Sequence, residues 1–198
     1  VKVIESVGLN PGADVSIALD IASTQFFDGQ KYNLKTEGKS LLPAEFVQYI
    51  SKLVNNQPIL SIEDPFAEDD WSAWQQFMQV APKELQVLGD DLLTTNLSRL
   101  NKAIAETSAN AILIKANQNG LVTSTLNVLK QARANNFNTV VSARSGETED
   151  SWLADLATGW RAGQIKVGST HGSERTAKWN RLLELEATEE SSFANPFN

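Results

Sequence analysis

Ionisable side chains recur along this sequence where short apolar runs end. Residues 58–62, Pro-Ile-Leu-Ser-Ile, form an apolar run that predicts a buried strand, and Glu63 and Asp64 follow it directly. Pro65 then ends the strand, because proline has no N–H to donate to a neighbouring strand. A strand that presents acids at its carboxyl end is how a parallel α/β barrel displays metal ligands. Taken alone, the stretch also fits a solvated acidic loop before a helix.

The same arrangement recurs at five further predicted strand ends. The six ends carry Asp20, Glu63, Asp90, Lys115, the turn 142–145 and Lys166. Three carboxylates from three successive strands would form a hard oxygen site suited to Mg²⁺. A nearby divalent cation disfavours the ammonium form of a lysine, so a lysine facing such a site can act as a general base. Each residue alone also fits a turn former or a solvated charge, but the whole set favours a functional site.

The elements that must position these residues follow a regular alternation. Apolar runs predict strands at 15–20, 58–62, 85–90, 111–115, 139–142 and 164–166. Helical spacing predicts helices at 43–56, 71–80, 95–105, 122–135, 152–158 and 173–186, and residues 29–34 could form one arm of a small hairpin. Strands and helices that alternate every 25 residues or so are typical of parallel βα units in an α/β fold. Six units fit either an open doubly wound sheet or part of a TIM barrel, which has eight.

Composition narrows the class of protein. A chain of 198 residues with 41% hydrophobic content can bury one sizeable core, so we expect one barrel-type segment over 1–186 and a polar tail over 187–198. The net charge of −7 argues against a nucleic-acid partner and permits a cation site. No cysteine is present, which fits a reducing, cytoplasmic location, and no apolar run is long enough to span a membrane. The single histidine, His171, excludes a zinc site built from several histidines of this chain.

Several short motifs occur in a fixed order along the chain. They are Leu19-Asp-Ile-Ala-Ser23, Ser61-Ile-Glu-Asp-Pro65 with Asp70-Trp71, Gly89-Asp-Asp-Leu92 with Thr95-Asn96, Ile114-Lys-Ala-Asn-Gln118, Ser145-Gly-Glu-Thr-Glu-Asp150, Gly163-Gln-Ile-Lys166, and Ser173-Glu-Arg175 with Lys178 and Asn180. With these motifs the chain resembles the enolases, the phosphopyruvate hydratases of glycolysis, across nearly all of its length. The resemblance is to the last six βα units of the enolase TIM barrel.

The resemblance implies a role for each predicted site residue. It implies a Mg²⁺ site that holds the substrate carboxylate through three ligands, Asp20, Glu63 and Asp90. Lys115 would be the base that removes the C2 proton of 2-phosphoglycerate, and Lys166 would contact the substrate carboxylate and steady the enolate. Arg144 and Ser145 would bind the phosphate, a task that suits the fork of donors on arginine. Loss of hydroxide from C3 would then give phosphoenolpyruvate.

The chain also departs from the enolase pattern. Ala143 stands where the family has a histidine that would border the substrate. His171-Gly172 stands where the family often has a serine–arginine pair, and a lone histidine in a glycine-rich loop indicates a surface residue. The capping domain, the first two barrel strands, the mobile loops and the glutamates that assist loss of hydroxide have no counterpart here. We therefore expect a homo-oligomer, or completion by a missing segment, to cover the exposed strand edges.

Three hypotheses about function follow. The first is a Mg²⁺-dependent lyase acting on a small-molecule substrate, 2-phosphoglycerate or phosphoenolpyruvate. The second is a catalytically silent enolase relative, or a fragment, that serves as a binding or assembly module; Ala143 and the absent units favour it. The third is another reaction of the enolase superfamily on a different carboxylate, against which the Arg144–Ser145 turn argues.

Overall fold

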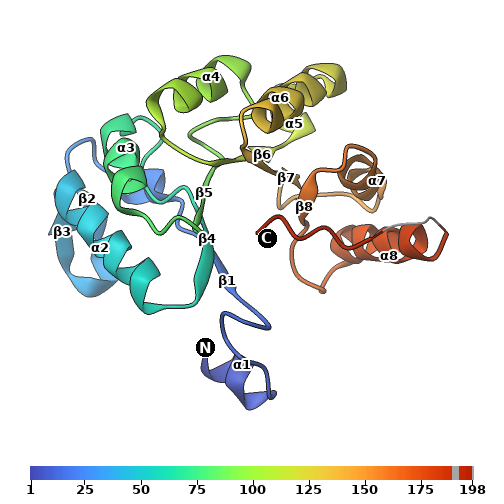
Figure 1. The fold of residues 1–198 in the computed structure, drawn as a ribbon, viewed down its shortest axis with the longest axis horizontal. Coiled ribbons are helices and arrows are strands. Elements are labelled where there is room, and N and C mark those ends of the chain that lie inside the picture. Colours follow the sequence, from blue (N-terminus) through green and yellow to red (C-terminus); the bar gives the residue numbers. More distant parts are fainter. Residues whose placement is uncertain (189–191, 198) are drawn as a thin grey trace. The chain divides into compact units, whose positions relative to one another are not determined.

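The computed structural model describes residues 1–188 and 192–197 (Figure 1). The chain forms two compact units, the first made of Val1–Leu93 with Asn101–Asn110 and the second of Thr94–Leu100 with Ala111–Asn198. Helix α4 (Leu97–Glu106) contributes residues to both units. The division of the chain into a segment 1–186 and a tail 187–198 stays a prediction, and residues 189–191 and 198 of that tail lie outside the described residues.

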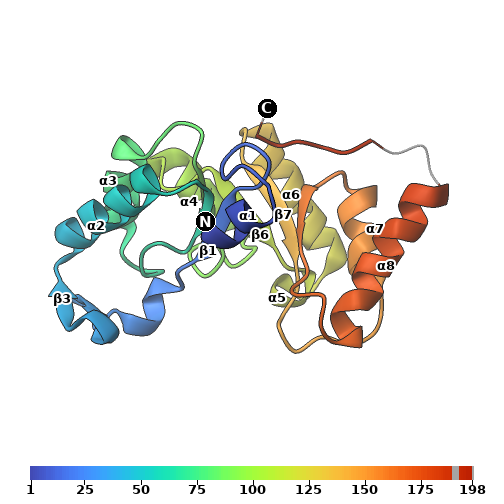
Figure 2. The same ribbon diagram turned by 90° about the horizontal axis from the view of Figure 1, so that it is seen from below.

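Three parallel strands form the sheet of the first unit. They are β1 (Ile17–Asp20), β4 (Ile59–Glu63) and β5 (Gln86–Gly89), in the order β1-β4-β5. The unit also holds α1 (Lys2–Ser6), α2 (Pro43–Asn56) and α3 (Trp71–Val80), of which α2 and α3 lie side by side (Figure 2). Between β1 and α2 the chain inserts a hairpin, β2 (Tyr32–Leu34) and β3 (Lys39–Leu41), with short 3₁₀ turns at Ser23–Phe26 and Lys35–Glu37.

A buried aromatic cluster holds the inserted hairpin against the rest of the first unit. The ring of Tyr32 is fully buried and stacks on Phe46 of α2, with 4.2 Å between ring centroids. The Tyr32 hydroxyl donates to Asp70 Oδ2 (2.8 Å) and accepts from the Ala67 N–H (3.0 Å). Asp70 also caps α3 by accepting from the Ala73 N–H, so one carboxylate fixes both the hairpin and the start of the helix.

The second unit repeats the strand–helix pattern. Its parallel strands are β6 (Ala111–Ile114), β7 (Asn138–Ser142) and β8 (Gly163–Lys166), in the order β6-β7-β8. Its helices are α5 (Ala116–Asn119), α6 (Val122–Ala134), α7 (Trp152–Gly159) and α8 (Ser173–Thr188). Helices α7 and α8 lie side by side (Figure 2), and Arg181 of α8 joins them by donating to Asp155 Oδ1 (2.8 and 3.0 Å).

These elements confirm the predicted α/β class and six parallel strands. The main difference at an element boundary is α4, which begins at Leu97 and not at residue 95. Thr94 and Thr95 both have a φ of 49°, a left-handed backbone that excludes them from a helix. The Asn96 side chain accepts from the Ser98 and Arg99 N–H groups and so caps the helix. Within the described residues, no helix has the length and apolar character that crossing a bilayer requires.

Candidate functional site

The carboxyl ends of the three strands in the first unit carry acidic residues. Asp20 ends β1 and pairs in register with Glu63, which ends β4. β5 ends at Gly89, and Asp90 and Asp91 follow. Glu63 and Asp90 are buried, whereas Asp20 is exposed. The three predicted metal ligands therefore come from three successive strand ends of one sheet.

A closer group of carboxylates forms around Asp90. Among the described residues, oxygen atoms of Asp64, Asp90 and Asp91 all lie within 4.8 Å of one another, an arrangement that could hold a metal ion. Asp90 belongs both to this group and to the predicted ligand set, while Asp20 and Glu63 are outside the group. Carboxylate oxygens are the ligands that hard divalent ions prefer, so the donor set fits such an ion.

Asp64 holds the turn that follows β5. Its Oδ1 accepts from the Asp90 N–H (3.0 Å) and its Oδ2 from the Asp91 N–H (2.8 Å). Its own N–H donates to Leu88 O (3.0 Å), and its φ of 42° is one that aspartate tolerates better than most residues. With both oxygens bonded to main-chain N–H groups, the Asp64 carboxylate orients the 90–91 turn. Sequence reasoning placed Asp64 at a strand end but missed this role.

The pKa of Asp64 reflects effects that act in opposite directions. The side chain is only 3% exposed, and this burial raises the pKa of Asp64 to about 7. The hydrogen bonds from the main-chain N–H groups of Asp91 and Asp90 act against the rise in pKa, because they favour the charged form. The nearby carboxylates of Asp90 and Asp91 add to the rise in pKa, and burial is the largest of these effects.

Gly89 allows the turn after β5 to close tightly. A Cβ atom at this position would lie 2.7 Å from Cγ of Leu93, closer than non-bonded carbon atoms approach. The Leu93 side chain is fully buried, so it has little room to move aside. The glycine in the Gly-Asp-Asp motif is therefore required by packing beneath the acidic turn.

In the second unit the strand ends carry basic and hydroxyl residues. Lys115 follows β6 directly and is buried, with 7% of its surface exposed. Lys166 ends β8 and pairs in register with Ser142, which ends β7. Arg144 and Ser145 follow β7 in an exposed turn. Lys115, Lys166 and the Arg144–Ser145 turn thus lie at the carboxyl ends of three successive strands of this unit's sheet.

Thr95 positions the backbone of Lys115. Its Oγ1 accepts from the Lys115 N–H (2.9 Å) and lies 3.1 Å from both Leu113 O and Gln118 Oε1, to either of which it can donate. The Asn119 side chain donates to Thr95 O (2.9 Å). A fully buried, β-branched residue with positive φ is uncommon, and such backbone strain of about 1–3 kcal/mol clusters at functional sites. The sequence analysis placed Thr95 at the start of a predicted helix, and its distance of 20 residues from Lys115 hid the contact.

The structure locates two residues at which the sequence departs from the enolase pattern. Ala143 is half-buried directly after Ser142, and the Ser142 hydroxyl donates to its carbonyl (3.3 Å). His171 is exposed in the loop before α8, where its carbonyl accepts from Arg175 (3.4 Å). The exposure of His171 agrees with its interpretation as a surface residue.

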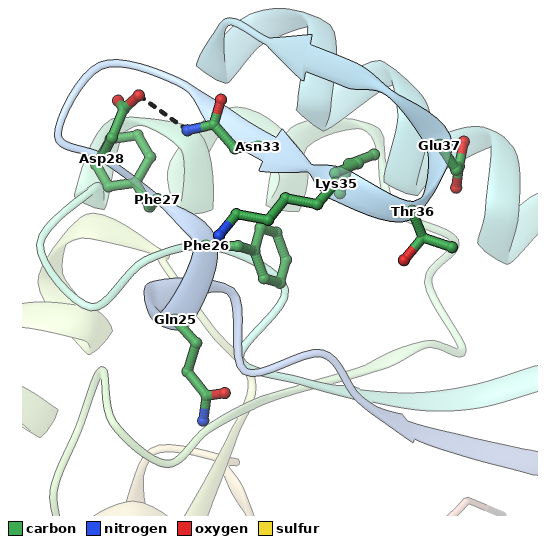
Figure 3. Close-up of a pocket in the computed structure, with 9 residues that line it drawn as sticks. Gln25, Phe26, Phe27, Asp28, Asn33, Lys35, Thr36 and Glu37 are labelled. Carbon is green, nitrogen blue, oxygen red and sulfur yellow. Dashed lines mark hydrogen bonds between the residues drawn. The ribbon is translucent and has the colours of Figure 1, made fainter.

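An open pocket of about 620 Å³ lies elsewhere, in the insertion between β1 and α2 (Figure 3). Its lining includes Phe26, Phe27, Asp28, Asn33 and Lys35, and none of the predicted site residues. Asp28 accepts from Asn33 (2.8 Å) within it, as Figure 3 shows. The pocket is therefore lined by other residues than those at the strand ends.

The fold and the strand-end residues together define the class of protein. Parallel βα units with ionisable groups at their carboxyl ends are typical of TIM-barrel enzymes. Residues 1–195 match the family described as "Enolase, C-terminal TIM barrel domain". The chain therefore belongs to the family of enolase C-terminal TIM barrel domains. This membership confirms the predicted resemblance at the level of the family and supports a lyase-type function of the enolase superfamily.

Proposed function

We propose that this chain carries the metal ligands and the general base of a phosphopyruvate hydratase, which interconverts 2-phosphoglycerate and phosphoenolpyruvate in glycolysis. The observation that supports the proposal most strongly is the family match over residues 1–195, together with ionisable residues at every predicted strand end. A cytoplasmic location and a homo-oligomer, or completion by another segment, are parts of the same proposal.

The proposed metal is Mg²⁺, held by Asp20, Glu63 and Asp90. When bound, Mg²⁺ would supply positive charge beside the substrate carboxylate, where negative charge grows as the C2 proton leaves. Asp64 would not need to be a ligand, because its two oxygens already accept main-chain hydrogen bonds and hold the Asp90 turn.

The proposed chemistry of the second unit begins with Lys115. Its amine would accept the C2 proton of 2-phosphoglycerate, acting as the general base. Lys166 would donate hydrogen bonds to the substrate carboxylate as charge develops there. Arg144 and Ser145 would bind the phosphate group. We assign no residue of this chain to protonation of the departing hydroxide.

The test is Mg²⁺-dependent formation of phosphoenolpyruvate from 2-phosphoglycerate, followed by ultraviolet absorbance. We expect Lys115→Ala to lower the rate by about 10²–10⁴-fold, the usual effect of removing a general base. Lys130→Ala removes an exposed lysine from α6 and serves as the matched control, with an unchanged rate. A rate that is the same in Lys115→Ala and in the unmodified chain would contradict the proposed role of Lys115.

A second candidate function is a catalytically silent relative that acts as a binding or assembly module. Ala143 favours it, because this half-buried residue stands where the family pattern has a histidine. Saturable Mg²⁺ binding with no turnover by the unmodified chain would support this candidate against the lyase. Turnover of a different carboxylate, but not of 2-phosphoglycerate, would point to another reaction of the superfamily.

A further inference from the structure

Lys178 of α8 is the most deeply buried charged side chain among the described residues, with 1% of its surface exposed. It lies outside every predicted strand end. Moving an ammonium group out of water is costly unless its donors are paired with acceptors, and removal of one partner of a buried pair is strongly destabilising. The identity of its partners therefore indicates what the residue does.

The Lys178 ammonium has three oxygen partners within this unit. It donates to Thr148 O (2.5 Å) and to Glu174 O (2.7 Å), and it forms an ion pair with Glu147 Oε2 (3.5 Å). A lysine ammonium has three N–H donors, so these three acceptors match its capacity. Glu174 belongs to α8 itself, whereas Glu147 and Thr148 belong to the loop that follows β7.

That loop, residues 143–150, connects β7 to α7 and contains no helix or strand. Arg144 and Ser145 lie in its first half and are exposed. The two loop residues that contact Lys178 come two and three positions after Ser145. Lys178 therefore joins α8 to the loop close to the proposed phosphate-binding turn.

We propose that Lys178 is a positioning residue that clamps the 143–150 loop, through Thr148 O and Glu147, in the conformation in which Arg144 and Ser145 bind the substrate phosphate. The phosphate part of this inference rests on the proposed function. The clamp itself rests on the three contacts of Lys178. Lys178 does not touch the substrate in this role. Because it orders the loop beforehand, the loop loses less conformational entropy when a ligand binds.

The plainer interpretation is that Lys178 only attaches α8 to the rest of the unit. Arg181 provides the matched control, because it lies in the same helix and joins α8 to α7 through Asp155 without contacting the loop. If α8 attachment were the whole role, Lys178→Met and Arg181→Met would change the same properties. The two variants should differ if Lys178 positions the loop.

The deciding measurement is amide hydrogen exchange of residues 143–150 in the full chain, made alongside thermal unfolding. We expect Lys178→Met to speed exchange in this loop by tenfold or more, and Arg181→Met to leave it unchanged. Lys178→Arg, which keeps the charge and the donors, should restore part of the protection. Should Lys178→Met not fold, Glu147→Gln removes the ionic partner alone and should give a smaller increase. Loop exchange that is unchanged in the folded variants, or raised equally by Arg181→Met, would overturn the clamp.

Binding of 2-phosphoglycerate in the presence of Mg²⁺, measured by calorimetry, tests the link to phosphate. We expect Lys178→Met to weaken this binding about tenfold or more, while Mg²⁺ binding in the absence of substrate stays unchanged. If the chain is active, KM should rise more than kcat falls. Faster loop exchange in a chain whose unmodified form does not bind 2-phosphoglycerate would leave the clamp standing and contradict the proposed function.

Discussion

One compact unit buries acidic side chains and the other buries basic ones. Among the described residues, the buried acids are Glu63, Asp64 and Asp90 of the first unit, and the buried bases are Lys115 and Lys178 of the second. In each unit, main-chain groups bond to one of these side chains. Asp64 accepts hydrogen bonds from two N–H groups, whereas Lys178 donates to two carbonyls. The same device, with reversed polarity, thus supports an acidic side chain in one unit and a basic side chain in the other.

The first prediction tests whether the buried carboxylates of the first unit bind a cation. We expect Mg²⁺ to raise the Tm of the unmodified chain, because a ligand at 100 times its Kd stabilises the folded state by about 2.7 kcal/mol. Asp90→Asn should remove this rise, since it deletes the carboxylate shared by the predicted ligand set and the observed acidic group. Lys115→Met, which changes the second unit only, should keep it. A rise in Tm that persists in Asp90→Asn would contradict Mg²⁺ binding through the Asp90 carboxylate.

A second prediction concerns the pH dependence of stability through Asp64. Its folded-state pKa of about 7 exceeds the unfolded value of 3.8, so between these pH values the folded chain holds a proton that the unfolded chain has lost. The free energy of unfolding of the metal-free chain should therefore fall as pH rises from about 4 to about 7, on the order of 4 kcal/mol in full from this group. Asp64→Asn, which cannot ionise, should lack this contribution.

Urea unfolding with a chelator, at pH 5 and pH 8, measures the difference between Asp64→Asn and the unmodified chain. At pH 5 the variant should be less stable by about 1–3 kcal/mol, because one main-chain N–H loses its acceptor. At pH 8 this difference should be smaller or reversed. A difference that does not change with pH would argue against a buried, protonated Asp64.

The prediction with the smallest expected effect concerns the hydrogen bond that Thr95 accepts from the Lys115 N–H in the second unit. Thr95→Val keeps the shape of the side chain but leaves the Lys115 N–H without its acceptor. We expect a loss of about 1–3 kcal/mol in the free energy of unfolding, the cost of an unsatisfied buried donor. Ser98→Ala, at an exposed position in α4, is the control. No loss in Thr95→Val would mean that the Lys115 N–H finds another partner.

The strands and their ends could be predicted because the signals are local. Pro65 marks the end of β4 after Glu63, and the apolar run before Lys115 marks β6. The supporting residues could not be predicted, because their roles depend on contacts between distant parts of the chain. Asp64 reaches residues 26 and 27 positions further on, and Lys178 reaches a loop 30 positions earlier. A lysine in a helix gives no sequence signal that separates a buried clamp from a solvated charge.

Helix α4 has a consequence for attempts to divide this protein. Its residues Leu97–Leu100 belong to the second unit, whereas Asn101–Asn110 return to the first. Asn110 is one of those returning residues, and its side chain accepts from the Val87 N–H (2.7 Å) and donates to Leu85 O (2.8 Å) at strand β5. A gene cut after residue 93 would therefore encode a first half without Asn110 and its hydrogen bonds to the main chain at β5. The two halves interlace along the chain, so neither can be produced whole by a single cut between them.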